Sequence, residues 1–170
     1  MALSLSSHFQ LLARYNSAVN EQIYAACAQI TDDEYRRKRT GSFGSIHGLL
    51  NHILLADRIW MVRFSDSEMT STPPLDTILF DHLLDLRKAR VSQDRSIENF
   101  MESLDEDFLN REFRYVNNAG LRCLDPAPLV LAHFFNHQTH HRGQIHVMLA
   151  SAGVKGLSLD LHRTLKAPLA

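Results

Sequence analysis

The sequence predicts an all-helical protein arranged as a four-helix bundle, and three observations lead to this fold class. Apolar residues recur at steps of three, four or seven over long segments, as the buried stripe of a helix requires. Glycine and proline are few, with 7 and 5 among 170 residues. Alternating apolar patterns with turn residues between them are confined to one short stretch before the last helix. Four long amphipathic segments make a bundle the economical architecture.

The first two predicted helices follow from their apolar pattern and from a capping residue. The first covers about residues 6–30. Its buried stripe is formed by Phe9, Leu12, Val19, Ile23, Cys27 and Ile30. A basic, glycine-containing connection over residues 35–44 is expected to cover one end of the fold. Ser42 or Ser45 can then cap the second helix, which carries residues 47–64.

The third predicted helix follows a proline pair at residues 73–74, which no helix can cross. We therefore expect a new element to start near residues 75–78 and the helix to extend to about Leu104. The charged run at residues 87–90 and the acidic residues after it are expected to face solvent. His82 is also expected at the surface.

A change of pattern before the last helix indicates extended structure. Residues 113–116 and 121–124 are apolar-alternating segments, and they flank the sequence Asn-Asn-Ala-Gly at residues 117–120. This turn-forming cluster predicts a short hairpin or a pair of extended arms.

The last helix has clear signals at both ends. Asp125 suits the cap position and Pro126 the first turn, while Gly153 suits the position just beyond the last turn. From Val154 onward, the tail is expected to lie extended against the bundle without a catalytic part.

Length and composition indicate a single domain over residues 1–170, of ordinary apolar content. A formal net charge of −1 provides no basic field, so we expect no binding to nucleic acid. The sequence contains neither an apolar run long enough for a membrane span nor the pattern of a signal peptide, so a cytoplasmic protein without membrane partners is expected. Cys27 and Cys123 have no CxxC spacing and are expected to be free thiols.

The strongest functional signal lies between residues 133 and 146, which contain five of the ten histidines. His137 and His141 are one helical turn apart and fall inside the apolar stripe, so both side chains are expected to point inward. Two stacked buried imidazoles would otherwise need two separate partners, whereas one metal ion satisfies both. The other three, His133, His140 and His146, are expected to be partly exposed or capping residues.

A third ligand is best supplied by His52 on the second helix. On the helical wheel, His52 stands beside Ala56 and Trp60, while His47 projects from a different side. Three neutral imidazoles leave open coordination positions, as in catalytic metal sites, and they suit zinc, nickel or iron.

The residues around this histidine pair exclude a protease and include two polar side chains whose positions can be predicted. The segment resembles the zinc-peptidase sequence His-Glu-x-x-His, but Gln138 stands where the catalytic base would be required, which excludes a protease. Gln144 projects near His137 and His141 and is a candidate for contact with the metal ligands or the substrate. Arg142 is expected to project outward as a surface charge or dimer contact.

Two sequence segments together resemble the DinB/YfiT-like family. They are His-Ile-Leu-Leu-Ala-Asp-Arg-Ile-Trp at residues 52–60 and Asn-His-Gln-Thr-His-His-Arg-Gly-Gln at residues 136–144. The resemblance spans the whole chain. It implies an up-down-down-up four-helix bundle that binds a divalent metal through His52, His137 and His141. It also implies a homodimer and, in several relatives, a thiol-dependent transferase or isomerase.

Two functional classes follow. The first is a metal-dependent enzyme, a thiol S-transferase or a hydrolase, that acts on a small-molecule substrate with a low-molecular-weight thiol or water as nucleophile. No inward Ser, Cys or Glu stands at helical spacing from the histidine pair, so the nucleophile would come from outside the chain. The second class is a non-catalytic bundle that binds a metal or small ligand in a structural or stress-response role.

Overall fold

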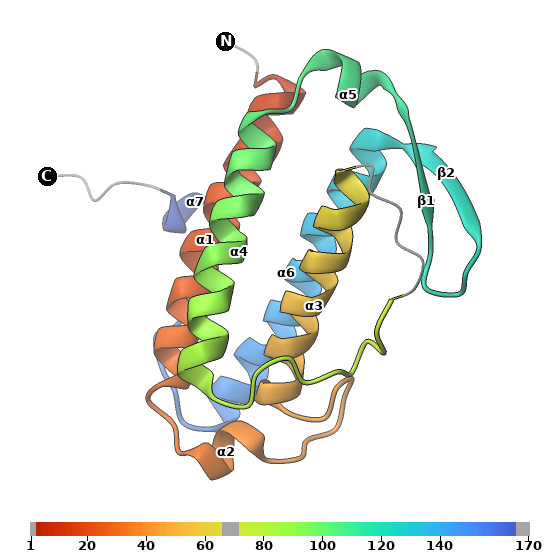
Figure 1. The fold of residues 1–170 in the computed structure, drawn as a ribbon. Coiled ribbons are helices and arrows are strands. Elements are labelled where there is room, and N and C mark those ends of the chain that lie inside the picture. Colours follow the sequence, from red (N-terminus) through yellow and green to blue (C-terminus); the bar gives the residue numbers. More distant parts are fainter. Residues whose placement is uncertain (1–2, 66–71, 166–170) are drawn as a thin grey trace, which may run out of the picture.

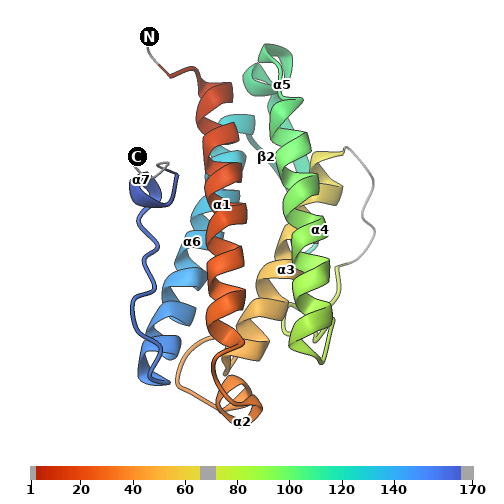
Figure 2. The ribbon, with the colours of Figure 1, turned by 90° about the vertical axis from the view of Figure 1, so that its left-hand side faces the viewer.

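The computed structural model describes residues 3–65 and 72–165, and most of these residues are helical. The four long helices are α1 (Leu5–Cys27), α3 (Ile46–Phe64), α4 (Leu83–Glu102) and α6 (Ala127–Ser151). Helices α4 and α6 each pack against both α1 and α3, so the four enclose a common interior (Figures 1 and 2). Helices α1 and α6 run in one direction and α3 and α4 in the other (Figure 1). The predicted helical class is therefore confirmed.

Shorter elements connect the long helices. Strands β1 (Glu112–Val116) and β2 (Arg122–Pro126) form an antiparallel hairpin, so the first of the two alternatives expected for this stretch is correct. The Asn117 side chain accepts hydrogen bonds from the backbone of Ala119 and Leu121 and thereby shapes the turn. The short helices, which the apolar pattern did not predict, are α2 (Asp32–Arg36), α5 (Glu106–Asn110) and α7 (Leu161–Thr164).

The starts of two helices differ from prediction. Helix α4 begins at Leu83, not near residues 75–78, because the backbone amides of Leu79 and Phe80 both donate to Asn51 Oδ1 on α3 at 2.9 Å. These bonds hold the preceding segment along α3 in a non-helical path. At the start of α6, Asp125 does not cap the helix; its carboxylate accepts a hydrogen bond from the hydroxyl of Tyr115 in the hairpin.

Two other predicted boundaries are confirmed, at the start of α3 and at the end of α6. Ser45, the second of the two suggested caps, accepts a hydrogen bond from the Gly48 amide at the start of α3. Gly153 has φ +89° just beyond α6, a conformation that favours glycine. The tail then runs back along α1, where the Tyr15 hydroxyl donates to the Leu159 carbonyl at 2.5 Å. None of the helices described is both long and apolar enough to cross a membrane.

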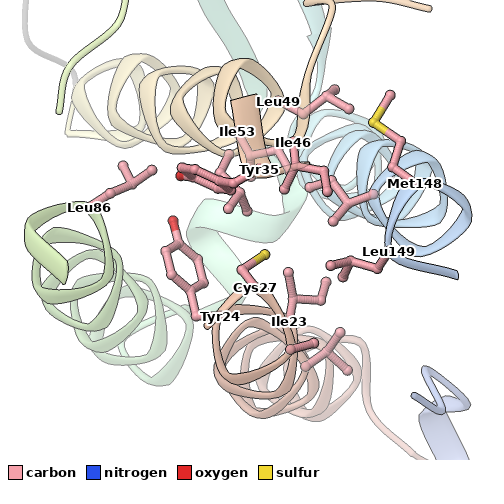
Figure 3. Packing of buried hydrophobic residues seen from close by; sticks show 14 of the residues in the cluster. Ile23, Tyr24, Cys27, Tyr35, Ile46, Leu49, Ile53, Leu86, Met148 and Leu149 are labelled. Carbon is pink, nitrogen blue, oxygen red and sulfur yellow. The ribbon is translucent and has the colours of Figure 1, made fainter. Parts of the chain in front are cut away.

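The apolar interior is divided into two clusters along the helix axes. One contains Ile23, Leu49, Leu86 and Leu149, one from each long helix (Figure 3). The other, nearer the hairpin, is rich in aromatic side chains, including Phe9, Phe64, Phe113 and Phe134. Burial of these surfaces, at roughly 25 cal/mol per Å² of apolar area, is the main force that holds the helices together.

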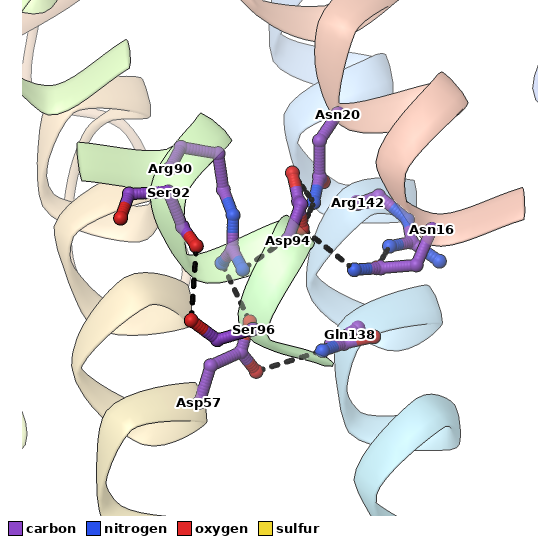
Figure 4. A network of polar contacts seen from close by, with 9 residues as sticks. All are labelled: Asn16, Asn20, Asp57, Arg90, Ser92, Asp94, Ser96, Gln138 and Arg142. Carbon is purple, nitrogen blue, oxygen red and sulfur yellow. Dashed lines mark hydrogen bonds and ion pairs between the residues drawn. The ribbon is translucent and has the colours of Figure 1, made fainter. Parts of the chain in front are cut away.

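A network of buried polar and charged side chains joins the four long helices (Figure 4). Arg90 on α4 contacts Asp57 on α3 at 2.5 Å and Asp94 on its own helix at 2.9 Å. Asp94 also accepts hydrogen bonds from Asn16 and Asn20 of α1. The expectation that this charged face of α4 is solvated is therefore wrong for Arg90 and Asp94, although Arg87 and Lys88 are exposed.

Helix α6 completes the network. Gln138 donates to Asp57 Oδ1 at 2.8 Å, and Arg142 donates to Asn16 Oδ1 and lies over the ring of Tyr15. The prediction that Arg142 projects outward is wrong, because its side chain is buried. The bond to Asn16, the ring of Tyr15 and the nearby charges of Asp57 and Asp94 offset the cost of burying this cation. These contacts come from other helices, so the periodicity of one helix cannot reveal them.

Candidate metal centre

Three histidines from two helices converge beside the charge network. His52 of α3 meets His137 and His141 of α6, and each offers one ring nitrogen within 4.8 Å of the other two. The Nε2 atom of His137 lies 3.3 Å from that of His52 and 3.1 Å from that of His141. The structure thus brings together the three residues that the sequence singled out.

Hydrogen bonds on the far side of two rings orient their nitrogen lone pairs. His52 Nδ1 lies 2.9 Å from the carbonyl oxygen of Leu75, and His141 Nδ1 lies 2.9 Å from Gln144 Oε1. Both oxygens can only accept, so each Nδ1 carries the proton and each Nε2 presents a lone pair towards His137. This arrangement is the outer contact that metal-binding histidines commonly make.

Protein hydrogen bonds alone do not satisfy such a cluster well. A proton on His137 Nε2 could serve one of its two neighbours fully, and the remaining lone pair would face another nitrogen. A divalent ion would accept a lone pair from all three nitrogens at once. The donor set therefore fits a metal ion with three histidine ligands.

The electrostatic surroundings keep these imidazoles neutral. Burial, reinforced by the neighbouring histidines, lowers the pKa of His137 to about 3. Burial also lowers the pKa values of His52 and His141, against the opposing effect of their bonds to Leu75 and Gln144. All three rings are thus available as neutral ligands at physiological pH.

These shifts predict a pH dependence for the metal-free protein. The pKa of a histidine in the unfolded chain is about 6.5. Below that pH, residue 137 therefore binds a proton in the unfolded chain but not in the native protein. The free energy of unfolding should therefore fall progressively as the pH decreases from about 6.5 towards the native pKa of about 3. Urea unfolding of the metal-free protein at pH 7, 6 and 5 measures this contribution.

The matched variant for this measurement is His137→Asn. Burial raises the pKa of Asp94 to about 6, so its contribution to stability changes with pH in the opposite direction. The wild type and the variant both contain Asp94, so its contribution cancels when their free energies of unfolding are compared. The stability of the variant should fall less between pH 7 and pH 5, and equal slopes would contradict the assignment.

An aromatic side chain covers the cluster from one side. The ring of Phe43 stacks on His52, with ring centroids 3.6 Å apart, and meets the edge of His141. Phe43 adopts φ +62°, a left-handed conformation that costs a non-glycine residue roughly 1–2 kcal/mol. Gly48 makes this path possible, because a Cβ there would lie 2.2 Å from the Phe43 carbonyl oxygen.

On another side, the cluster borders a cavity of about 420 Å³ between α3, α6 and the turn of the hairpin. His52 and His137 line one part of it. Trp60, Arg63 and Tyr115 line another part, together with Asn118 from the turn. A small molecule in this cavity would contact the histidine cluster directly.

The other candidate residues lie outside the cluster. His133 and His140 are exposed as expected, and His82 lies at the surface. His47 is buried elsewhere, with its Nε2 3.0 Å from the Phe80 carbonyl oxygen. Within the described chain both cysteines are free thiols, as predicted. Phe43, Leu75 and Arg63 were missed, since their roles depend on loop paths and on the hairpin.

The fold and the site together define a class of protein: a mostly helical chain whose long helices present a buried three-histidine cluster. The sequence profile of the DinB family matches residues 3–168, and the chain belongs to this family. Protein DinB of Bacillus subtilis is 27% identical over 92% of this chain and 96% of its own length. The crystal structure of a DinB-like protein from the same organism, YjoA, superposes with a TM-score of 0.61 at 18% identity, covering 86% of this chain and 95% of YjoA.

Proposed function

We propose that this protein binds one divalent metal ion through His52, His137 and His141 and uses it in enzymatic catalysis. The observation that carries the proposal is the convergence of three Nε2 atoms, two of them oriented by Nδ1 hydrogen bonds. Zinc, nickel and iron all suit three histidine ligands. The four long helices would then form a four-helix bundle with an up-down-down-up path around the site.

The proposed reaction is transfer of a low-molecular-weight thiol to a small electrophile, with hydrolysis as the related alternative. A divalent ion in such a site lowers the pKa of a bound thiol or water, which supplies a nucleophile at neutral pH. Within the described chain, the group of possible ligands comprises these three histidines alone, which leaves positions for exogenous molecules. The adjacent cavity supplies apolar walls from Ile59 and Trp60 to hold the electrophile.

The choice of His52 over His47 can be tested by metal analysis. His52→Ala should weaken metal binding strongly, because it removes one of three ligands. His47→Ala should leave metal content nearly unchanged, since that ring bonds to the Phe80 carbonyl away from the cluster. Both proteins should be purified without an affinity tag and their metal measured by mass spectrometry. The reverse pattern would show that the site lies elsewhere.

The transferase proposal predicts turnover that depends on the metal site. The protein, loaded with zinc, nickel or iron in turn, should conjugate a small thiol to an aryl halide or epoxide faster than His137→Ala protein does. Thiol addition should also perturb the spectrum of the nickel or iron form. If neither effect appears with any metal, the non-catalytic alternative, a metal- or ligand-binding helical protein, replaces the enzyme.

The proposal extends to assembly as a homodimer, which the family resemblance suggests. Sedimentation equilibrium of the metal-loaded protein distinguishes a dimer from a monomer.

A further inference from the structure

The cavity beside the histidines contains a buried arginine that has no acidic partner in the part of the chain that the structure describes. Arg63 near the end of α3 lines the cavity and is only 7% exposed. No carboxylate forms an ion pair with it among residues 3–65 and 72–165. This differs from the charge network, where Arg90 is placed between two aspartates. An isolated cation in such a place is costly unless an anion joins it.

The surroundings hold the guanidinium in place without neutralising it. Its Cζ atom lies over the Trp60 ring, 4.7 Å from the ring centroid, and 5.5 Å from the ring centroid of Tyr115. Its Nη2 donates to the side-chain oxygen of Asn118 at 2.8 Å, and its Nε is buried without a hydrogen-bond partner. Burial lowers the pKa of Arg63. Aromatic rings and one neutral amide leave the positive charge available to a ligand.

The remaining lining has one consistent electrostatic character. Among the described residues that line it, the polar side chains other than Arg63 are histidines, asparagines and Tyr115, without a carboxylate. At the other end of the cavity, a divalent ion bound by His52 and His137 would add positive charge. The Arg63 end of the cavity therefore favours negative charge, and the histidine end would do so once it held the ion.

We propose that the cavity binds a small organic molecule with an anionic group, carboxylate or phosphoryl, that Arg63 holds while the rest of the molecule extends towards His52 and His137. This inference rests on the proposed function for the role of the histidine end. Arg63 is then the residue that selects anionic over neutral substrates. Guanidinium groups pair well with both kinds of anion.

Trp60 permits a direct binding measurement, because it is the only tryptophan and lines the cavity. The probes are 3-phenylpropionate, its neutral amide and 2-phenylethylphosphonate, titrated into zinc-treated protein while tryptophan fluorescence is followed. At least one of the two anions should bind about tenfold or more tightly than the amide, as expected for a charge-assisted hydrogen bond. The tighter of the two anions identifies the ligand class. Equal affinities for amide and both anions would overturn the proposal.

Three variants of α3 test whether Arg63 causes the preference for anions. Arg63→Gln should bind anion and amide about equally, and Arg63→Lys should keep part of the preference. Arg58→Gln is the matched control. Arg58 lies on the same helix as Arg63, but its guanidinium lies over the ring of Phe80 and does not line the cavity. An Arg63→Gln protein that keeps the full preference would contradict the assignment. If the Arg63→Gln protein fails to fold, the affinities of the anions and the amide for the wild-type protein still decide whether the cavity prefers anions.

Titration of His137→Ala protein separates this inference from metal binding. If Arg63 holds the anion, this protein should still prefer anions, whether or not the wild type binds metal. A preference that disappears in His137→Ala but persists in Arg63→Gln would mean that the metal holds the anion, and the proposal would be wrong. Metal content, measured in the same samples, reports on the proposed function independently.

Discussion

His137→Ala and His141→Ala proteins are each expected to lose the metal almost completely. Either change leaves only two of the three proposed ligands. Loss of an outer contact to a ligand typically costs about 10- to 100-fold in metal affinity, and loss of a ligand should cost more. Competition titrations with a chromophoric chelator measure the affinity.

Exposed histidines of the same helix provide matched controls for these variants. His133→Ala and His140→Ala should retain about one ion per chain, because neither ring belongs to the converging group. Full metal content in both His137→Ala and His141→Ala would refute histidine ligation. Protons compete for the same nitrogens, so affinity should also decrease in acid.

Arg90→Met is expected to destabilise the fold by about 3–5 kcal/mol, the usual cost of removing one partner from a buried ion pair. The change leaves Asp57 and Asp94 without their cation in the interior. Typical domains are stable by only about 5–15 kcal/mol, so this loss is a large fraction of the total. Urea unfolding at pH 7 measures it.

Arg87→Met is the control for this experiment, one turn earlier on α4 and exposed. Its effect should stay within about 0.5 kcal/mol, as for most surface substitutions. If Arg90→Met cost less than about 1 kcal/mol, the network would contribute little to stability. The helices would then be held in register by the apolar clusters alone.

Sequence periodicity could predict the three-histidine cluster because its residues follow simple helical geometry. His137 and His141 share one face of α6, and His52 lies on the face of α3 that meets it. The same reasoning was wrong for Arg142, which periodicity assigned to the surface. Polar residues that pair across helices look like solvent-facing residues when each helix is read alone.

The parts of the site that lie on loops could not be predicted. Leu75, which orients His52, lies in a segment whose path depends on the bonds from Leu79 and Phe80 to Asn51. Phe43 reaches the site through a left-handed backbone conformation that helical or strand patterns do not encode. Contacts of this kind depend on tertiary structure, which a single sequence does not display.

The position of the Phe43 ring also bears on the order in which a metal ion and an organic ligand would bind at the proposed site. Since the ring covers one face of His52, the cavity on the side of His52 and His137 offers a route by which ions and small molecules can reach the cluster. A molecule bound there would obstruct that route. An ion that uses this route would load before the organic ligand and leave after it, so we expect occupancy of the cavity to slow the exchange of metal.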